Sequence, residues 1–189
     1  MIYSCEGNIG AGKSTLLAKE KMRMEDKHYI FLQEPVDEWT KVCDENGNIL
    51  ENFYKDPKKY AFAFQILAFT TRLSILKKTM KENPDAIIIC ERSLQADGNI
   101  FAKMLYDDGL IDEISYRIYM KMYEEAVLEF PLAGIIYLSA SPEVCNERIR
   151  KRNRLGEENI SLDYLKKCHR YHEEWLKNEN IVSMDSFDF

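Results

Sequence analysis

Residues 7–14 read Gly7-Asn8-Ile9-Gly10-Ala11-Gly12-Lys13-Ser14 and fit the pattern G-x-x-x-x-G-K-[ST]. The octapeptide lies between a short apolar run, Ile2–Cys5, and an amphipathic stretch, Ser14–Met24. This context predicts a strand, a loop and a helix in that order. Glycines let successive backbone N–H groups turn inward, and these amides form a positive concavity with the helix N-terminus for phosphate oxygens. The motif therefore predicts a nucleoside triphosphate site, but it does not specify a reaction.

Each side chain of this loop has an expected role. Lys13 adds a mobile charge, and the Ser14 hydroxyl is a ligand type that Mg²⁺ accepts. The predicted phosphate-binding residues of the loop are Gly7, Asn8, Ile9, Gly10, Ala11, Gly12, Lys13, Ser14 and Thr15.

The rest of the chain repeats the alternation of strand and helix. Four more apolar runs are rich in β-branched residues and lack polar alternation, which is typical of buried parallel strands. They are Tyr29–Leu32, Ala86–Cys90, Gly134–Ser139 and Ile181–Met184. The helical patterns between them are Pro57–Lys81, Asp112–Phe130, Pro142–Arg154 and Ser161–Lys177. This order predicts an α/β fold with a parallel sheet and helices on both faces. We expect residues 1–189 to form a single domain.

Composition excludes several classes of protein. The 189 residues are 46% hydrophobic and 31% charged, which is ordinary for a globular protein and excludes disorder. Lys and Arg number 26 against 32 Asp and Glu, so the net charge of −6 argues against a nucleic-acid partner. No apolar run approaches the roughly 18 residues of a membrane span, so no membrane partner is expected.

The five cysteines and the start of the chain indicate the compartment. The cysteines are scattered and never in C-x-x-C spacing, which predicts free thiols in a reducing, cytoplasmic environment. The chain enters its first expected strand at Ile2, so we expect no signal or transit peptide.

Two acidic residues follow strands that should end at the same edge of the sheet. Glu34 and Glu91 come after the second and third apolar runs, and ligands of open α/β sheets bind at this carboxyl edge. A single acid there could be an ordinary solvated carboxylate, whereas two beside a phosphate loop favour a functional site. Glu91 is suited to hold Mg²⁺ together with Ser14. Glu34, with a reference pKa of about 4.3, is ionised at neutral pH and could accept a proton from an attacking hydroxyl.

Glu34 also indicates which kind of acceptor the site prefers. An anionic acceptor about 4 Å from this carboxylate would cost roughly 4 kcal/mol at an effective dielectric constant near 20. That cost corresponds to about a thousandfold in affinity, so a neutral hydroxyl is preferred over a phosphate. Arg92 could pair with Glu34 and hold the hydroxyl oxygen, or it could form a simple surface ion pair.

The long helical stretch has two faces. One face is a core stripe of Phe62, Ile66, Phe69, Leu73 and Leu76. The second face consists of Ala61, Phe64, Gln65, Ala68 and Arg72. Gln65 can donate to and accept from a planar base edge, on which Phe64 and Phe101 could stack. An exposed helix edge with solvated polar groups fits the spacing equally well. Trp39 and Tyr54 are expected to pack with polar tips, and Tyr54 could reach a sugar hydroxyl.

A basic stretch and two histidines come late in the chain. Glu147–Arg154 holds five basic residues, of which Arg148 and Arg152 share one helix face, with Arg154 close by. Arginines closing over a transferring phosphate stabilise its transition state, so a lid over about 148–160 is expected. A solvated helix end and a nucleic-acid patch are the alternatives. His169 and His172 lack the acid or cysteine spacing of a zinc site and are expected at the surface.

Several of these motifs together resemble the deoxyribonucleoside kinases of the deoxycytidine, deoxyguanosine and deoxyadenosine kinase type. The similarity covers essentially all 189 residues. It rests on Gly7–Thr15, on Glu34-Pro35-Val36 with Trp39, on Phe62-Ala63-Phe64-Gln65 with Arg72, on Glu91-Arg92-Ser93 with Asp97, and on Arg148–Glu157 after Ser141-Pro142-Glu143.

The resemblance implies a P-loop kinase fold of three layers, with a five-stranded parallel sheet in the order 2-3-1-4-5, an arginine-rich lid and a homodimer. It also implies transfer of the γ-phosphate of ATP, with Mg²⁺, to the 5′-hydroxyl of a deoxynucleoside in nucleotide salvage.

The same resemblance assigns roles residue by residue. Glu34 would be the general base, Arg92 would hold the 5′ oxygen, and Glu91 would be the magnesium acid. Gln65, Arg72 and Asp97 would contact the base, and Tyr54 and Glu157 the 3′-hydroxyl. Arg148, Arg152 and Arg154 would be the lid arginines. By the same resemblance, an acid at Asp97 beside Arg72 implies that the enzyme accepts deoxycytidine or purine deoxynucleosides.

Three features depart from the family pattern. Gly98 stands where an arginine is expected, which would loosen the base pocket, and Leu155-Gly156 replaces a more polar lid tip. The sequence ends at Phe189, where the family normally adds a closing helix. Residues 184–189, including Asp185, would line the donor adenine.

Two alternatives stay open at this point. One is a nucleoside monophosphate kinase similar to thymidylate kinase, which Glu34 argues against. The other is a non-catalytic kinase-fold subunit, since fold alone does not prove activity. The presence of Lys13, Ser14, Glu34, Glu91 and Arg92 favours an enzyme.

Overall fold

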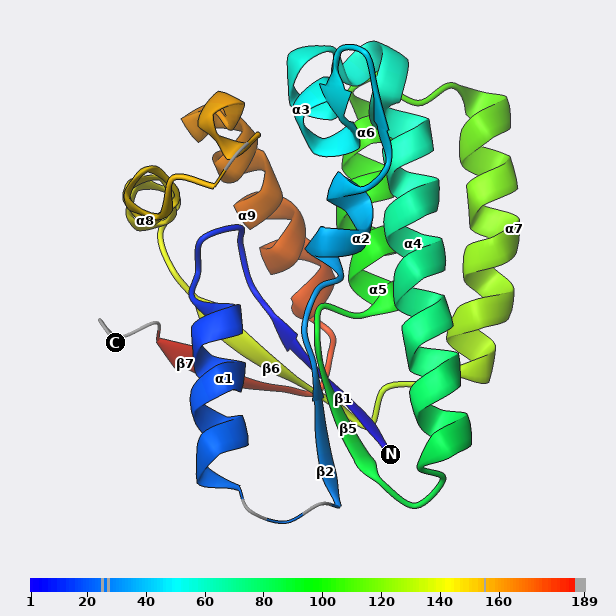
Figure 1. Ribbon diagram of the computed structural model, residues 1–189, viewed down its shortest axis with the longest axis vertical. Helices are drawn as coiled ribbons and strands as arrows, with labels where there is room; N and C mark the ends of the chain where they lie inside the picture. Colours follow the sequence, from blue (N-terminus) through cyan, green and yellow to red (C-terminus); the bar gives the residue numbers. More distant parts are fainter. Residues whose placement is uncertain (25, 27, 155, 186–189) are drawn as a thin grey trace.

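A five-stranded parallel sheet forms the centre of the protein (Figure 1). The computed structural model describes residues 1–24, 26, 28–154 and 156–185. The strands are β1 (Ile2–Glu6), β2 (Tyr29–Leu32), β5 (Ile87–Glu91), β6 (Gly134–Ser139) and β7 (Ile181–Asp185). They lie in the order β2-β5-β1-β6-β7, and every neighbouring pair is parallel. Counted along the chain, this is the predicted order 2-3-1-4-5, so the predicted fold class is confirmed.

The helices form where local sequence signals start them. Asn48 and Glu51 make a capping box for α3, Asp56 caps α4 just before Pro57, and Ser141 caps α8 just before Pro142. The helices are α1 (Lys13–Arg23), α2 (Val36–Thr40), α3 (Ile49–Lys55), α4 (Pro57–Glu82), α5 (Leu94–Ala96), α6 (Lys103–Asp107), α7 (Glu113–Glu129), α8 (Pro142–Arg152) and α9 (Leu162–Leu176), with a π-helix η1 (Asp97–Ala102) and a 3₁₀-helix η2 (Glu157–Asn159).

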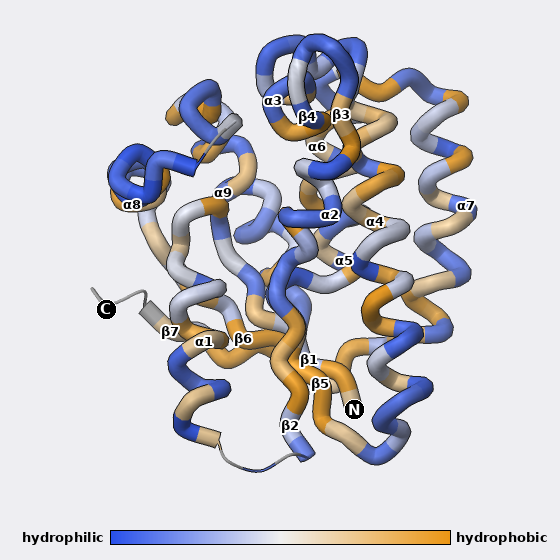
Figure 2. Tube along the Cα trace, in the orientation of Figure 1, coloured by the Kyte–Doolittle hydropathy of each residue, from blue (hydrophilic) through white to orange (hydrophobic). Residues whose placement is uncertain are grey.

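Helices cover both faces of the sheet, as the sequence predicts. Leu16 and Leu17 of α1 pack on one face, against Cys5 and Leu138. The helices α4 and α7 pack on the opposite face against β1 and β5, and α9 packs there against β6. Figure 2 shows the strands as the most hydrophobic part of the trace, enclosed by helices with mixed or hydrophilic outer sides. The apolar strands therefore form the middle of three layers.

Both predicted faces of α4 are covered. Phe69 and Leu76, from the first stripe, lie in the core between α4, α7 and the sheet. The second stripe is also buried: Gln65 is 3% exposed, and Phe64 packs with α2 and α3. The alternative of a solvated helix edge is therefore wrong, because α2 and α3 cover this side of α4.

Two local contacts add detail to this fold. The turn around Asp44–Asn48 joins the short strands β3 (Cys43–Asp44) and β4 (Gly47–Asn48) into a hairpin. Gly98 lies against the ring of Tyr123 on α7, where an added Cβ would be 2.3 Å from Cε2. The missing side chain at Gly98 therefore makes room for Tyr123. The expected loosening of the base pocket stays a prediction.

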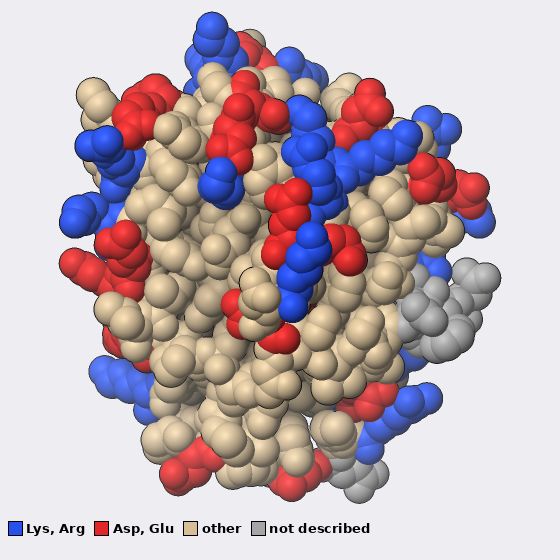
Figure 3. Space-filling view, turned by 180° about the vertical axis from the view of Figure 1, so that it is seen from behind, with Lys and Arg blue, Asp and Glu red and all other residues tan. Residues whose placement is uncertain are grey.

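The surface and the cysteines agree with the composition. All five cysteines are free, and four of them are buried. Within the described residues, we find no helix of the length and apolarity that a membrane span requires. Figure 3 shows acidic and basic side chains interleaved over the rear face.

The close contact between Gly98 and Tyr123 gives a stability prediction. Gly98→Ala should lower the free energy of unfolding by about 1–3 kcal/mol, because the buried ring must move away from the new methyl group. Chemical denaturation measures this change. In a Tyr123→Leu background the same substitution should cost less, and an equal cost in both backgrounds would contradict the packing explanation.

Candidate functional site

The glycines of the phosphate loop are required by its geometry. Gly10 and Gly12 have φ values of 81° and 104°, in the region that favours glycine. A Cβ on Gly10 would also lie 2.6 Å from the carbonyl oxygen of Cys145. Lys13 donates from Nζ to the carbonyls of Gly7 and Asn8, at 3.1 and 3.0 Å. Burial lowers the pKa of Lys13, and the charge of Arg92 lowers it further.

The side chain of Asn8 holds the loop rather than facing the cleft. Its Nδ2 donates to the carbonyl of Leu165 on α9 at 2.9 Å, and its Oδ1 accepts from the amide of Ile9. Asn8 can therefore contact phosphate only through its backbone.

Ser14 and Glu91 lie together at the carboxyl edge of the sheet. The Ser14 hydroxyl donates to Oε1 of Glu91 at 2.7 Å. No cluster of three or more His, Cys, Asp or Glu side chains suited to a metal occurs in the part of the chain that the structure describes. One hydroxyl and one carboxylate fit Mg²⁺, which is held by few protein ligands together with waters and phosphate oxygens.

Glu34 lies between two arginines. Its Oε1 pairs with Nε of Arg92 at 3.0 Å and accepts a hydrogen bond from Arg72. Arg72 also donates to Asp97 at 2.5 Å. Arg92 is only 3% exposed, so the alternative of a simple surface ion pair is wrong. The four side chains form one network of two acids and two arginines, in which Arg92 and Asp97 are buried and Glu34 and Arg72 are partly exposed.

The charges of this network set the protonation of Glu34. Burial by itself would raise the pKa of Glu34, but Arg92, Arg72 and Lys13 outweigh it and lower the pKa to about 2. The pKa of Asp97 is raised by burial, although Arg72 opposes the rise. Glu34 therefore carries a full negative charge at physiological pH.

The network forms part of the wall of a cavity. The lining comprises Ile9, Glu34, Val36, Trp39, Leu50, Tyr54, Phe64, Gln65, Ala68, Arg72, Arg92, Asp97, Phe101, Arg154, Glu157 and Tyr164. All ten predicted substrate-binding residues are among them. Two buried acceptors in this cavity, Oε1 of Gln65 and Oδ2 of Asp97, have no hydrogen-bond partner among the described residues. Within this part of the chain, both oxygens therefore lack the partner that buried polar atoms normally have.

The cavity opens into a cleft above the phosphate loop. The cleft is lined by Ile9, Gly10, Gly12, Lys13, Ser14, Thr15, Gln33, Glu34, Val36, Asp37, Glu91, Arg92, Arg148, Arg152, Arg154 and Glu157. Glu34 and Arg92 line both spaces, so they stand where the cavity meets the cleft.

The basic stretch borders the cleft. Arg148 donates to the carbonyl of Ala11 in the phosphate loop at 3.1 Å. Arg152 and Arg154 pair with Glu157, at 2.6 and 3.2 Å. Leu155 and residues 186–189 lie outside the described residues, as does the side chain of Asp185. The expected adenine contacts of residues 184–189 therefore stay a prediction.

Comparison with known proteins agrees with this geometry. A family model described as deoxynucleoside kinase matches residues 3–189. The chain belongs to the deoxynucleoside kinase family. The prediction of a kinase of this family is therefore confirmed.

Similar proteins include kinases named for different bases. A "Probable deoxycytidine kinase" of Fowlpox virus (strain NVSL) is 39% identical over 180 residues, covering 94% of this chain and 72% of the relative. The deoxycytidine kinase of Mus musculus is 35% identical over 207 residues, covering 98% and 78%. The mitochondrial deoxyguanosine kinase of Xenopus laevis is 33% identical over 203 residues, covering 97% and 76%.

This deoxynucleoside kinase has two buried residues near Arg92 that sequence reasoning missed. Glu6, at the end of β1, is fully buried and accepts the amide of Ser93 at 2.9 Å. Burial raises its pKa. His172, expected at the surface, is fully buried, because α9 turns it toward Arg92. Its sequence signal is its position one turn after Cys168 and two turns after Leu165, on the apolar side of an amphipathic helix.

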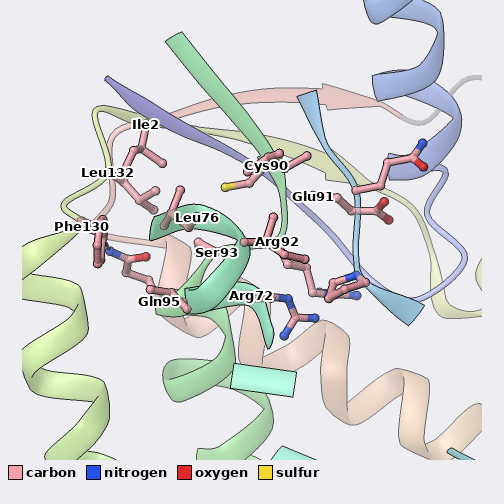
Figure 4. A pocket seen from close by; sticks show the side chains of 15 residues that line it. Ile2, Arg72, Leu76, Cys90, Glu91, Arg92, Ser93, Gln95, Phe130 and Leu132 are labelled. Atoms are coloured by element: carbon pink, nitrogen blue, oxygen red, sulfur yellow. Dashed lines mark hydrogen bonds between the residues drawn. The ribbon is translucent and has the colours of Figure 1, made fainter. Parts of the chain in front are cut away.

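A mostly apolar cavity of the kinase adjoins the network from the other side. Figure 4 shows Ile2, Leu76, Phe130 and Leu132 together at one end of it. Arg72 and Arg92 turn their guanidinium groups away from this end. The hydrocarbon portions of these arginines therefore border apolar surface while their charges face the acids.

The low pKa of Glu34 predicts the pH dependence of the kinase. Glu34 stays ionised until the pH falls toward about 2, so kcat/KM for the nucleoside should show no acid limb from Glu34 above about pH 5. The profile is measured at saturating Mg·ATP. An acid limb near about pH 6–7 that Glu34→Asp shifts would contradict this assignment.

Proposed function

We propose that this kinase transfers the γ-phosphate of ATP to the 5′-hydroxyl of deoxycytidine or of a purine deoxynucleoside, in nucleotide salvage. One observation carries the proposal. A cavity with two unpaired buried acceptors, on Gln65 and Asp97, ends at the pair Glu34 and Arg92, beside the phosphate loop. This arrangement suits a neutral ligand with a planar, hydrogen-bond-donating end and a hydroxyl at the other end.

The base preference follows from the two acceptors. An exocyclic amino group, as in cytosine or adenine, or the N–H edge of guanine, donates to such oxygens. Thymine presents a carbonyl oxygen at the position where cytosine has its amino group, so two acceptors would face each other. Leaving a buried acceptor unpaired costs about 1–3 kcal/mol. The names of the relatives, deoxycytidine and deoxyguanosine kinases, support this choice.

Ring contacts support a flat ligand in this cavity. Phe64 meets Trp39 edge-on at 5.4 Å between ring centroids, which fixes the plane of the Phe64 ring. Phe101 lines the same cavity. Trp39 also donates from Nε1 to the hydroxyl of Thr71 at 2.9 Å, so its polar tip is engaged within the protein.

The reacting end needs a base and a positive charge at one point. In our proposal Arg92 holds the 5′ oxygen while Oε1 or Oε2 of Glu34 accepts its proton. A carboxylate with a low pKa is a weak base, so proton transfer would come late, as suits the loose transition states of phosphoryl transfer. Tyr54 and Glu157 line the cavity toward the lid and would bind the 3′-hydroxyl.

The phosphate end needs positive charge. Lys13, Arg148, Arg152 and Arg154 border the cleft and would stabilise the charge on the transferring group. Mg²⁺, held by Ser14 and Glu91, would neutralise phosphate charge when bound.

The quaternary and cellular setting is part of the same proposal. We propose that residues 1–189 act as one kinase domain that forms a homodimer. Ile114 and Ile118 on α7 are 71% and 52% exposed, which supports a covered surface there. The free thiols support a cytoplasmic location.

Removing the proposed base should abolish turnover. Glu34→Gln should lower kcat by about 10²–10⁴-fold, because the amide cannot accept the hydroxyl proton. The dissociation constant for Mg·ATP should change by less than about threefold. The matched control is Glu38→Gln, on exposed Glu38 of α2, which should leave kcat unchanged. Turnover that survives Glu34→Gln would contradict the role of Glu34.

Thymidine should be the poor substrate among the natural deoxynucleosides. With Mg·ATP, kcat/KM for deoxycytidine or a purine deoxynucleoside should exceed that for thymidine by about 10–100-fold, the factor that one unpaired buried acceptor costs. Steady-state assays of the four nucleosides measure this ratio. Fast thymidine turnover would leave the kinase assignment standing and overturn the base preference.

A further inference from the structure

His172 lies behind the arginine that the proposed function places at the 5′ oxygen. It belongs to α9, 80 residues along the chain from Arg92, and is fully buried. Its Nδ1 is 2.6 Å from the carbonyl oxygen of Cys168, one helical turn earlier. Its Nε2 is 3.3 Å from a terminal nitrogen of Arg92.

The two contacts define one form of the imidazole. A carbonyl oxygen only accepts, so Nδ1 must carry the hydrogen. A guanidinium only donates, so Nε2 must offer its lone pair. Only the neutral Nδ1–H tautomer satisfies both partners, because a protonated ring would place an N–H against the N–H of Arg92. Burial, with the charge of Arg92, also lowers the pKa of His172 well below its ordinary value.

Arg92 is thereby held on three sides. Its Nε pairs with Glu34, one terminal nitrogen donates to His172, and its guanidinium carbon lies 4.6 Å from the centre of the Phe101 ring. The backbone of Arg92 is left-handed, with φ of 62°, which non-glycine residues rarely adopt. An arginine on such a backbone, with a long and flexible side chain, needs contacts at its far end to keep one orientation.

A neutral partner suits this position better than an acid. A carboxylate in place of His172 would compete with Glu34 for the guanidinium and neutralise charge that the acceptor oxygen needs. The imidazole fixes the direction of one N–H without adding negative charge.

We propose that His172 is a positioning residue for phosphoryl transfer, which holds the Arg92 guanidinium through Nε2 in the orientation that faces Glu34 and the 5′ oxygen. The proposal rests on the proposed function for the role of Arg92. The same helix also anchors the phosphate loop, through the bond from Asn8 to the carbonyl of Leu165. Helix α9 thus contacts both the phosphate loop, through the carbonyl of Leu165, and Arg92, through His172.

Two amide variants separate this role from a structural one. In His172→Gln the side-chain amide reaches the place of Nε2 and can accept from Arg92. In His172→Asn the amide reaches only the place of Nδ1, so it can bond the carbonyl of Cys168 but not Arg92. We expect kcat to fall by about 10–100-fold in the Asn variant and to stay within about threefold of wild type in the Gln variant. KM for ATP should be nearly unchanged in both.

If His172 has only a structural role, the order of the kcat values of the two variants should be reversed. If the bond to Cys168 alone matters, the Asn variant retains the activity and the Gln variant does not, and that result overturns the proposal, as does equal kcat in both. His169→Asn and His169→Gln are the controls, since His169 lies on the same helix one turn away, and neither should change kcat.

The tautomer provides a test that needs neither turnover nor a variant that folds. Long-range ¹H–¹⁵N correlation of the wild-type protein should show His172 with hydrogen on Nδ1, a bare Nε2, and no titration between about pH 5.5 and 8. Hydrogen on Nε2 would overturn the proposal. If the wild type fails to phosphorylate any deoxynucleoside while this spectrum is as expected, the proposed function fails and the Arg92–His172 contact stands.

Discussion

The charge of Glu34, held between Arg72 and Arg92 with 18% of its side chain exposed, is the interaction on which the site depends. A carboxylate removed from water costs several kcal/mol unless it is paired and hydrogen-bonded, and here both arginines supply that pairing. Because Arg72 is also bonded to Asp97, one network joins Asp97 to Glu34 along the cavity.

The fold brings this network together from distant parts of the chain. Glu34 follows β2, Arg92 follows β5, and Arg72 comes from the middle of α4. The strands β2 and β5 are neighbours in a parallel sheet, so their carboxyl ends meet at the edge where the phosphate loop follows β1. Glu6 ties the turn after β5 to the end of β1 through the amide of Ser93. The cavity and the cleft above the phosphate loop thus meet at this edge of the sheet.

Much of this arrangement could be predicted from local sequence. The phosphate loop, the apolar strands and the two faces of α4 depend on spacing, and spacing is readable in one chain. The strand order came from the family resemblance and not from the residues themselves. Glu6 and the pairing of Gly98 with Tyr123 could not be predicted, because each depends on contacts between elements far apart in sequence. The burial of His172 could have been found from its place on the apolar side of α9. Its contact with Arg92 could not, because that contact depends on the packing of α9 against the turn after β5.

The role of Glu34 is tested most directly by comparing one nucleoside with its own monophosphate as acceptor. With Mg·ATP in excess, kcat/KM is measured for deoxycytidine and for deoxycytidine 5′-monophosphate under the same conditions. The negative charge of Glu34 at the acceptor position predicts a preference for the nucleoside of about a thousandfold, the factor that follows from like charges about 4 Å apart. Comparable or faster turnover of the monophosphate would contradict the placement of Glu34 at the acceptor oxygen, and with it the central claim.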